Sequence, residues 1–343
     1  MIFKNIDIHG CSELDTLESG AFATRRVPGY VHEKLCEQGK SQNINNTGIE
    51  FRFVLEEDEV TLKFRYRDDE RGEITVYYGE FVADWPETTK IVKGECEIKI
   101  IRSKNIEALR KIAKEYNHRF SPDVIRLVFR GARPQIFDVV GKISVPSADM
   151  YPKKKYLAYG SSITHGSIAL HPYYNYVERV AANLGADVTN YGFAGSARMQ
   201  PEFADFIAEE CEFDFATLEM GVNMLNPDTT DYENRIRYFV KRIAEAHPNS
   251  KIFAIDVYYC RSDILENGIA EGYRKTLQKV VGELALPNVI YVNGKTVLTN
   301  VNGLSEGLYH PNPNGIMEMA QDLTEIISAW TDVDGNPAEL VRG

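Results

Sequence analysis

The chain of 343 residues has no run of about 18 apolar residues, the length that a membrane-spanning helix needs. Its first residues also lack an apolar segment of signal-peptide length. Basic charge is scarce, because 39 Lys and Arg stand against 50 Asp and Glu, a formal net charge of −11. Since nucleic acids and anionic membranes are bound through basic faces, this balance argues against both as partners. We therefore expect a soluble, cytoplasmic protein.

Cysteine is also scarce, and its spacing is irregular. No Cys-x-x-Cys pair occurs among the five cysteines, which are Cys11, Cys36, Cys96, Cys211 and Cys260. An odd number of scattered cysteines in a chain long enough for a large core indicates reduced thiols rather than a disulfide framework or a structural zinc site. No set of His, Asp and Glu has metal-ligand spacing either, so we expect neither a metal nor an organic cofactor.

The first part of the chain has a pattern of short strands. Ile49–Leu55 and Val60–Tyr66 alternate apolar and polar side chains around an acidic tip, which predicts a half-buried antiparallel pair. Further strands are expected at Glu73–Val82, Cys96–Ile101 and Ile125–Phe129, and one helix at about Ile106–Glu115. Strands at this spacing predict an antiparallel, jelly-roll-like β-sandwich domain over residues 1–148.

Residues 149–343 alternate strands with helices. The expected strands are Tyr156–Tyr159, Asp187–Tyr191, Phe215–Met220, Lys251–Val257 and Val289–Val292. The expected helices are Tyr174–Leu184, Pro201–Glu210, Tyr232–Ala246, Ile264–Leu284 and Asn314–Trp330. This alternation predicts parallel strands with right-handed crossovers, and hence a three-layer α/β/α domain. In such sheets ligands bind beyond the carboxyl ends of the strands.

Four segments at or near these strand ends carry groups suited to acyl transfer. A serine in Gly160–Gly166 (GSSITHG) can expose its hydroxyl on a tight turn, and a glycine in Asn190–Ser196 (NYGFAGS) can aim its N–H at a ligand. Asn223 can donate its side-chain amide to a developing oxyanion. His310, in a Pro-rich turn, is a candidate general base. Each segment alone also has an ordinary structural interpretation, as a turn, a loop glycine, a helix cap or an exposed histidine.

Together and in this order, the four segments resemble the SGNH hydrolases, also called the GDSL esterase/lipase superfamily. Its four blocks are matched by GSSIT, GFAGS, GVNM and HPN, within about residues 154–330. The stretch GFAGSARMQPEFADFIAE is similar to a subgroup of GDSL-type lipase/acylhydrolases whose members carry an extra N-terminal β-sandwich. The resemblance implies a flavodoxin-like α/β/α catalytic domain over residues 149–343, preceded by that sandwich.

The resemblance also implies a role for each residue. Ser162 would be the nucleophile. Its backbone N–H, the N–H of Gly195 and the side chain of Asn223 would form the oxyanion hole. His310 would take the proton from Ser162 and return it to the leaving alcohol, which is the logic of a serine triad on another scaffold.

The acid of this triad departs from the family pattern. The last block usually reads Asp-x-x-His, but the residue three places before His310 is Gly307, which cannot orient an imidazole. Glu306, one place further back, serves if Tyr309 is an inserted residue. Alternatively, a backbone carbonyl orients His310 and the site works as a Ser-His dyad. Asp256, at the end of a strand, is a weaker candidate for the acid.

These residues predict a serine esterase that removes a short acyl group, such as acetyl, from a carbohydrate or another polyol. The expected substrate is a small-molecule ester such as an acylated oligosaccharide. The sandwich domain would bind sugar, cover the cleft or mediate a homo-oligomer. Two alternatives keep the same residues: an acyltransferase that passes the acyl group to an alcohol, and a non-catalytic carbohydrate-binding protein.

Overall fold

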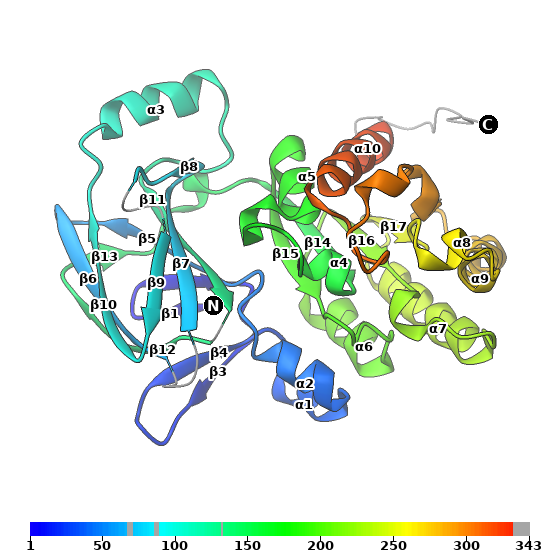
Figure 1. The fold of residues 1–343 in the computed structure, drawn as a ribbon. Helices are drawn as coiled ribbons and strands as arrows, with labels where there is room; N and C mark the ends of the chain where they lie inside the picture. The colour runs from blue at the N-terminus through cyan, green and yellow to red at the C-terminus, as the bar shows by residue number, and fades with distance from the viewer. Residues whose placement is uncertain (67–70, 86–88, 132, 332–343) are drawn as a thin grey trace. The chain divides into compact units, whose positions relative to one another are not determined.

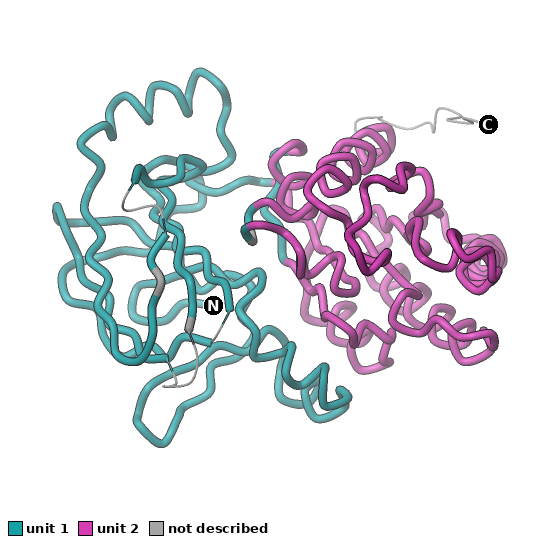
Figure 2. Tube along the Cα trace, viewed as in Figure 1, with its two compact units in different colours: residues 1–153, 171–173, 185–189 teal, residues 154–170, 174–184, 190–343 magenta. Residues whose placement is uncertain are grey.

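The computed structural model describes residues 1–66, 71–85, 89–131 and 133–331 (Figure 1). The chain forms two compact units (Figure 2). Unit 1 comprises residues 1–153, 171–173 and 185–189, and unit 2 comprises residues 154–170, 174–184 and 190–343. Two short later segments thus belong to the first unit. The predicted domain boundary between residues 148 and 149 stays a prediction.

Unit 1 is built on two antiparallel sheets. Sheet A contains β1 (Ile2–Phe3), β2 (Ile6–His9), β5 (Glu50–Leu55), β7 (Arg71–Tyr78), β8 (Phe81–Val82), β9 (Thr89–Lys93), β11 (Val124–Gly131) and β13 (Ile143–Ser144). Sheet B contains β3 (Glu13–Thr16), β4 (Phe22–Arg25), β6 (Glu59–Arg65), β10 (Glu95–Ile101) and β12 (Gln135–Val140). The helical segments are α1 (Gly29–Lys34), α2 (Glu37–Asn43), α3 (Ile106–Glu115) and the 3-10 turn η1 (Ala148–Met150). One apolar core joins both sheets, with Phe51 and Phe129 from sheet A against Phe64 from sheet B. This arrangement confirms the predicted fold class for the first half.

The expected pairing of Ile49–Leu55 with Val60–Tyr66 is wrong. Both segments are strands, but β5 pairs with β2 and β11 in sheet A, whereas β6 pairs with β10 and β12 in sheet B. The acidic residues between them connect two sheets and do not close a hairpin. The reason is that alternation reports which face of a strand meets the core, and it is the same whichever sheet the strand joins.

The expected single strand Glu73–Val82 is also divided. The first strand, β7, ends at Tyr78, and β8 begins at Phe81 and pairs back on β7. Gly79 between them has a φ of 60°, the left-handed conformation that a tight turn uses. The apolar residues on both sides of this turn hide it in the sequence.

Unit 2 contains sheet C, whose strand order is β15-β14-β16-β17-β18. Its strands are β14 (Lys154–Gly160), β15 (Ala186–Gly192), β16 (Phe215–Glu219), β17 (Lys251–Ile255) and β18 (Val289–Val292). Its helices are α4 (Ser162–His165), α5 (Tyr176–Leu184), α6 (Pro201–Glu210), α7 (Thr230–Ala246), α8 (Arg261–Ile264), α9 (Ile269–Leu284) and α10 (Pro313–Thr331). The 3-10 turns are η2 (Pro172–Tyr174), η3 (Val222–Met224), η4 (Gly294–Thr296) and η5 (Val301–Gly303). The first residues of β15 are among those assigned to unit 1.

Sheet C has the flavodoxin-like topology. The strands from β14 through β16 and β17 to β18 pair in parallel, and β15 lies on the other side of β14. Helices α5 and α10 pack together on one face, and α6, α7 and α9 cover the other (Figure 1). All five residues of β16 are buried, as expected for a strand covered on both faces. The strand order reverses between β14 and β16, the place where such sheets bind ligands. The predicted three-layer fold is confirmed.

The expected long helix Ile264–Leu284 is two helices. The first, α8, ends at Ile264, and α9 begins at Ile269. Between them Glu266 and Gly268 have φ values of 50° and 73°, which no α-helix contains. The side chain of Asn267 accepts a hydrogen bond from the N–H of Ile269 at 3.1 Å. The Asn-Gly pair thus forms a turn that the continuous apolar spacing conceals.

Candidate active site

The turn after β14 positions Ser162 as the first residue of α4. Ser161 caps this short helix, because its hydroxyl accepts a hydrogen bond from the N–H of Ile163 at 3.2 Å. Gly166 follows the helix in the left-handed conformation, with a φ of 82°, and so ends it. Ser162 is therefore held, half-buried, at the carboxyl edge of sheet C.

His310 lies beside Ser162. Its Nε2 is 2.7 Å from Ser162 Oγ, although the two residues are 148 positions apart in the sequence. The loop before α10 holds the histidine, because the N–H of Ser305 donates to its carbonyl oxygen at 2.8 Å. Burial lowers the pKa of His310, which keeps the imidazole neutral at neutral pH. A neutral imidazole in this position can accept the proton of the serine hydroxyl.

A buried carboxylate that the sequence analysis did not consider supports the same turn. Glu219, at the end of β16, accepts hydrogen bonds from the N–H of Ser161 at 2.5 Å and from the hydroxyl of Thr164 at 3.1 Å. Burial raises the pKa of Glu219, and these hydrogen bonds oppose that rise. Gly160 makes room for this contact, since a Cβ at that position would collide with Thr164 and Glu219. The sequence does contain a signal for Glu219, which is the single charged residue in the apolar stretch FATLEM. A buried strand accommodates a charge only where other polar groups pair with it.

Two asparagines hold the other end of α4. The Nδ2 groups of Asn175 and Asn190 donate to the carbonyl oxygen of Thr164 at 2.6 and 3.0 Å. They satisfy a carbonyl that the end of a short helix leaves without a helical partner. Asn190 also accepts a hydrogen bond from the N–H of Gly192 at 2.7 Å. It therefore links the end of β15 to the turn that carries the nucleophile candidate.

The segments after β15 and β16 bring hydrogen-bond donors to this edge. Gly195 has a φ of 69°, a conformation that favours glycine. The Oδ1 of Asn223 in η3 accepts from the N–H of Ala197 at 3.0 Å, which leaves Nδ2 as a donor. Within the described ranges, the N–H of Gly195 and Nδ2 of Asn223 make no hydrogen bond. Ser162, as the first residue of α4, has no helical acceptor for its N–H. Donors of this kind can stabilise a developing oxyanion.

Neither of the two acid candidates forms a hydrogen bond or an ion pair with His310. Glu306 is exposed, and in the part of the chain that the structure describes it makes no hydrogen bond or ion pair. Asp256 accepts hydrogen bonds from the hydroxyl of Tyr291 at 2.5 Å and from the N–H of Gly294 at 2.6 Å. Burial raises the pKa of Asp256 to about 6. Asp256 thus caps the turn after β18, whereas a catalytic role for Glu306 stays a prediction.

Other features of the sequence can be compared directly with the structure. All five cysteines are free thiols, as their scattered spacing predicts. Among the described residues, no group of His, Cys, Asp and Glu side chains is arranged to hold a metal ion. None of the described helices combines the length and the apolar character needed to cross a bilayer. The absence of a cofactor stays a prediction.

Comparisons with known proteins place this geometry in a family. The model of the GDSL-like lipase/acylhydrolase family matches residues 153–328. A salicylyl-acyltransferase from a tetracycline biosynthetic pathway is similar in structure, with a TM-score of 0.73 and 19% identity over 95% of each chain. A family two carbohydrate esterase from Cellvibrio japonicus has a TM-score of 0.62 and 12% identity, also over 95% of each chain. No curated protein sequence matches the chain.

A third structure, an acetyl xylan esterase from the rumen bacterium Butyrivibrio proteoclasticus, has a TM-score of 0.53 and 13% identity, over 83% of this chain and 90% of its own. At such identities these likenesses show the fold alone. The family model, by contrast, is a match of sequence, and it spans all four segments that carry Ser162, Gly195, Asn223 and His310. The resemblance predicted from those segments is confirmed, and the chain belongs to the GDSL-like lipase/acylhydrolase family.

Proposed function

We propose that the protein is a serine esterase of the SGNH type, which hydrolyses a carboxylic ester through an acyl-enzyme on Ser162. The observation that carries this proposal is the 2.7 Å distance between Ser162 Oγ and His310 Nε2. Membership of the family and the position of the pair at the topological switch point of sheet C support it.

In the proposed reaction His310 takes the hydroxyl proton while Ser162 Oγ forms a bond to the ester carbonyl carbon. The N–H groups of Ser162 and Gly195 and the Nδ2 of Asn223 stabilise the oxyanion. When the tetrahedral intermediate collapses, the bond to the alcohol oxygen breaks and His310 protonates that oxygen. Water, deprotonated by His310, then attacks the acyl carbon; the bond to Ser162 Oγ breaks, His310 returns the proton to that oxygen, and the acid is released.

The proposed catalytic group takes one of two forms: a triad in which Glu306 is the acid, or a dyad of Ser162 and His310. The position of Glu306 supports the dyad, because this exposed side chain makes no hydrogen bond within the described residues. A carboxylate against His310 would raise the pKa of the imidazole, whereas burial lowers it here. For Glu306 to act, its side chain would have to move to the Nδ1 of His310.

For the substrate we propose a short acyl group, such as acetyl, on a carbohydrate or another polyol. The family two carbohydrate esterase and the acetyl xylan esterase among the similar structures support this choice. The similar salicylyl-acyltransferase supports a second candidate function, in which an alcohol and not water accepts the acyl group. The two functions differ in whether an added alcohol diverts the acyl group from water.

The test is the intact mass of the protein after treatment with a fluorophosphonate. We expect one adduct on the wild type and none on Ser162→Ala, because only an activated serine reacts. Ser167→Ala is the matched control, since Ser167 is exposed just after α4 and its loss should leave the adduct unchanged. A wild-type protein without an adduct would contradict the proposal and favour the non-catalytic carbohydrate-binding alternative.

A further inference from the structure

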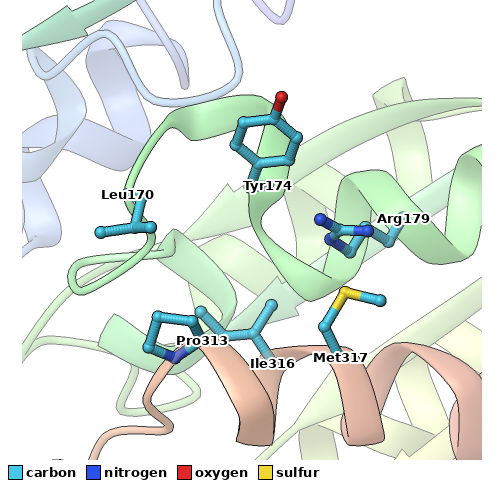
Figure 3. A pocket seen from close by; sticks show the side chains of 6 residues that line it. All are labelled: Leu170, Tyr174, Arg179, Pro313, Ile316 and Met317. Atoms are coloured by element: carbon cyan, nitrogen blue, oxygen red, sulfur yellow. The ribbon is translucent and has the colours of Figure 1, made fainter.

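A hollow of about 220 Å³ lies between the first turns of α5 and α10 (Figure 3). Its lining residues are Leu170, Tyr174, Arg179, Pro313, Ile316 and Met317. All but the arginine are apolar or aromatic, and several are unusually exposed for such residues, with 74% of Leu170 and 50% of Met317 accessible. An exposed apolar surface of this kind at a helix start is a candidate binding site.

The hollow lies at the same edge of sheet C as the Ser162–His310 pair. Helices that follow parallel strands begin at the carboxyl edge of the sheet, and both α5 and α10 begin at the hollow. Pro313, which lines it, is only three residues after His310, a chain length of at most about 11 Å. A substrate held by the catalytic pair can therefore extend into the hollow.

Arg179 is the charged residue of this hollow. Its guanidinium lies 5.1 Å from the centroid of the Tyr174 ring, and its nitrogen atoms turn toward the hollow (Figure 3). Among the described residues, no carboxylate pairs with Arg179, and its Nε is buried without a hydrogen-bond acceptor. Buried donors usually have acceptors, and a guanidinium matches the two oxygens of a carboxylate. The charge of the hollow thus suits an anionic ligand.

The chemistry of acyl transfer indicates which part of the ester lies here. The carbonyl oxygen must face the donors of Ser162, Gly195 and Asn223. The oxygen of the leaving alcohol must lie within reach of His310, because the imidazole returns the proton to it. The alcohol portion therefore extends from the reacting carbon on the side of His310. From His310 the protein chain continues directly into α10, whose first turn lines the hollow.

We propose that this hollow is the subsite for the alcohol portion of the ester, and that Arg179 selects alcohols in which a ring carries a carboxylate. The ring would lie against Tyr174 and the apolar side chains of Ile316 and Met317, and the carboxylate would pair with the guanidinium. The inference rests on the proposed function and narrows its substrate to esters of sugar acids or of hydroxyaryl acids. The same subsite would take the acceptor if the enzyme transfers the acyl group to an alcohol.

The test compares esters that differ by one carboxylate. One pair is phenyl acetate and 4-acetoxybenzoate, and the other is an acetylated methyl glucoside and the matching methyl glucuronoside. We expect kcat/KM to favour the carboxylated member of at least one pair by about tenfold, the effect of one charged hydrogen-bond pair. Arg179→Met should remove this preference, and Arg179→Lys should keep part of it. The pair that shows the preference tells whether the ring is a sugar or an aryl group.

Two other arginines serve as controls. Arg242→Met removes a half-buried guanidinium on α7 that pairs with Asp205 and Glu209, and it should leave the preference unchanged. Arg198 lines a separate hollow of about 410 Å³ that includes Asn223. If Arg198→Met removed the preference and Arg179→Met did not, the carboxylate would bind beside Asn223, and the inference would be overturned.

A binding measurement separates this inference from the proposed function. Calorimetry on Ser162→Ala, which cannot form the acyl-enzyme, should show tighter binding of 4-acetoxybenzoate or the glucuronoside ester than of its neutral partner, and Arg179→Met should abolish the difference. If the fluorophosphonate labels Ser162 but no carboxylate preference exists, the inference fails and the esterase stands. If labelling fails while the binding difference persists, the subsite stands and the proposed hydrolysis fails.

Discussion

The buried ion pairs of unit 1 and the groups around Ser162 and His310 in unit 2 differ in whether their polar atoms have partners. In unit 1, the buried Glu50 accepts hydrogen bonds from Nε of Arg52 at 2.8 Å and from two nitrogens of Arg126 at 2.8 and 2.5 Å. Arg52 also donates to both oxygens of Asp187, at 2.6 and 2.8 Å. Burial by itself would raise the pKa of Asp187, but Arg52 and the nearby His9 outweigh it and lower the pKa to about 2.

The groups around Ser162 and His310, at the carboxyl edge of sheet C, are the opposite case. Ser162 and His310 share one hydrogen bond, and burial is the influence on the imidazole pKa. The donors of Gly195 and Asn223 and the guanidinium of Arg179 face no acceptor among the described residues. A folded protein satisfies its buried polar groups wherever it can, so donors left over at one edge are available to a ligand.

The comparison teaches how to separate structural from functional polar groups in this chain. A buried charged group whose hydrogen-bonding and charge partners are all present holds the fold in one arrangement, since removing one partner leaves the other buried and uncompensated. A group that is positioned but not satisfied adds little to stability and can act on a substrate. Substitutions in the two regions should therefore have separate effects on stability and on activity.

The largest expected effect on stability is that of Glu50→Gln. This change leaves the buried guanidinium groups of Arg52 and Arg126 without their shared counter-charge, and should lower the free energy of unfolding by about 3–5 kcal/mol. Urea denaturation measures the loss. Glu107→Gln is the control, because Glu107 is exposed and its pairing with Arg110 should be worth less than about 1 kcal/mol. Equal losses in the two variants would remove the contrast between buried and exposed pairs.

Asn223→Ala should instead cause a large loss of activity and a small loss of stability. Loss of the Nδ2 donor should lower kcat by a factor of about 10²–10³, as is typical of an oxyanion-hole donor. The free energy of unfolding should change by only about 1 kcal/mol, because a single hydrogen bond to the N–H of Ala197 is lost. Steady-state kinetics and urea denaturation of the same preparation give both values. Unchanged kcat would exclude Asn223 from the proposed oxyanion hole.

The smallest effect is expected for Glu306→Gln, measured through the pH dependence of kcat/KM. In the proposed reaction the neutral imidazole is the base. The rate should therefore rise with pH through the pKa of His310, which burial places below the ordinary value of 6.5, and stay constant above it. In a dyad, Glu306→Gln should change the rate less than about threefold and leave the midpoint in place. If Glu306 paired with His310, the variant would lower both the rate and the midpoint, because a carboxylate favours the protonated imidazole.

The sequence by itself predicted most of the strands and helices of unit 2, but fewer than half of the strands that the structure describes in unit 1. The helix Pro201–Glu210 and the strand Val289–Val292 occur with their predicted bounds. Apolar periodicity and a proline in the first helical turn act over a few residues, so they can be interpreted without the fold. The motifs around Ser162 and His310 are equally local, and their order along the chain was sufficient to indicate the family.

Only the tertiary structure decided which groups meet. It placed β5 and β6 in different sheets, Glu219 against the turn that carries Ser162, and Arg179 in a hollow without a carboxylate, and it left Glu306 without a hydrogen bond to His310. The period of a strand does not specify its neighbour, and whether a charge is buried, paired or free depends on residues far away in the chain. The sequence therefore names the chemical groups of this protein, and the fold determines which of them have partners and which are left for a substrate.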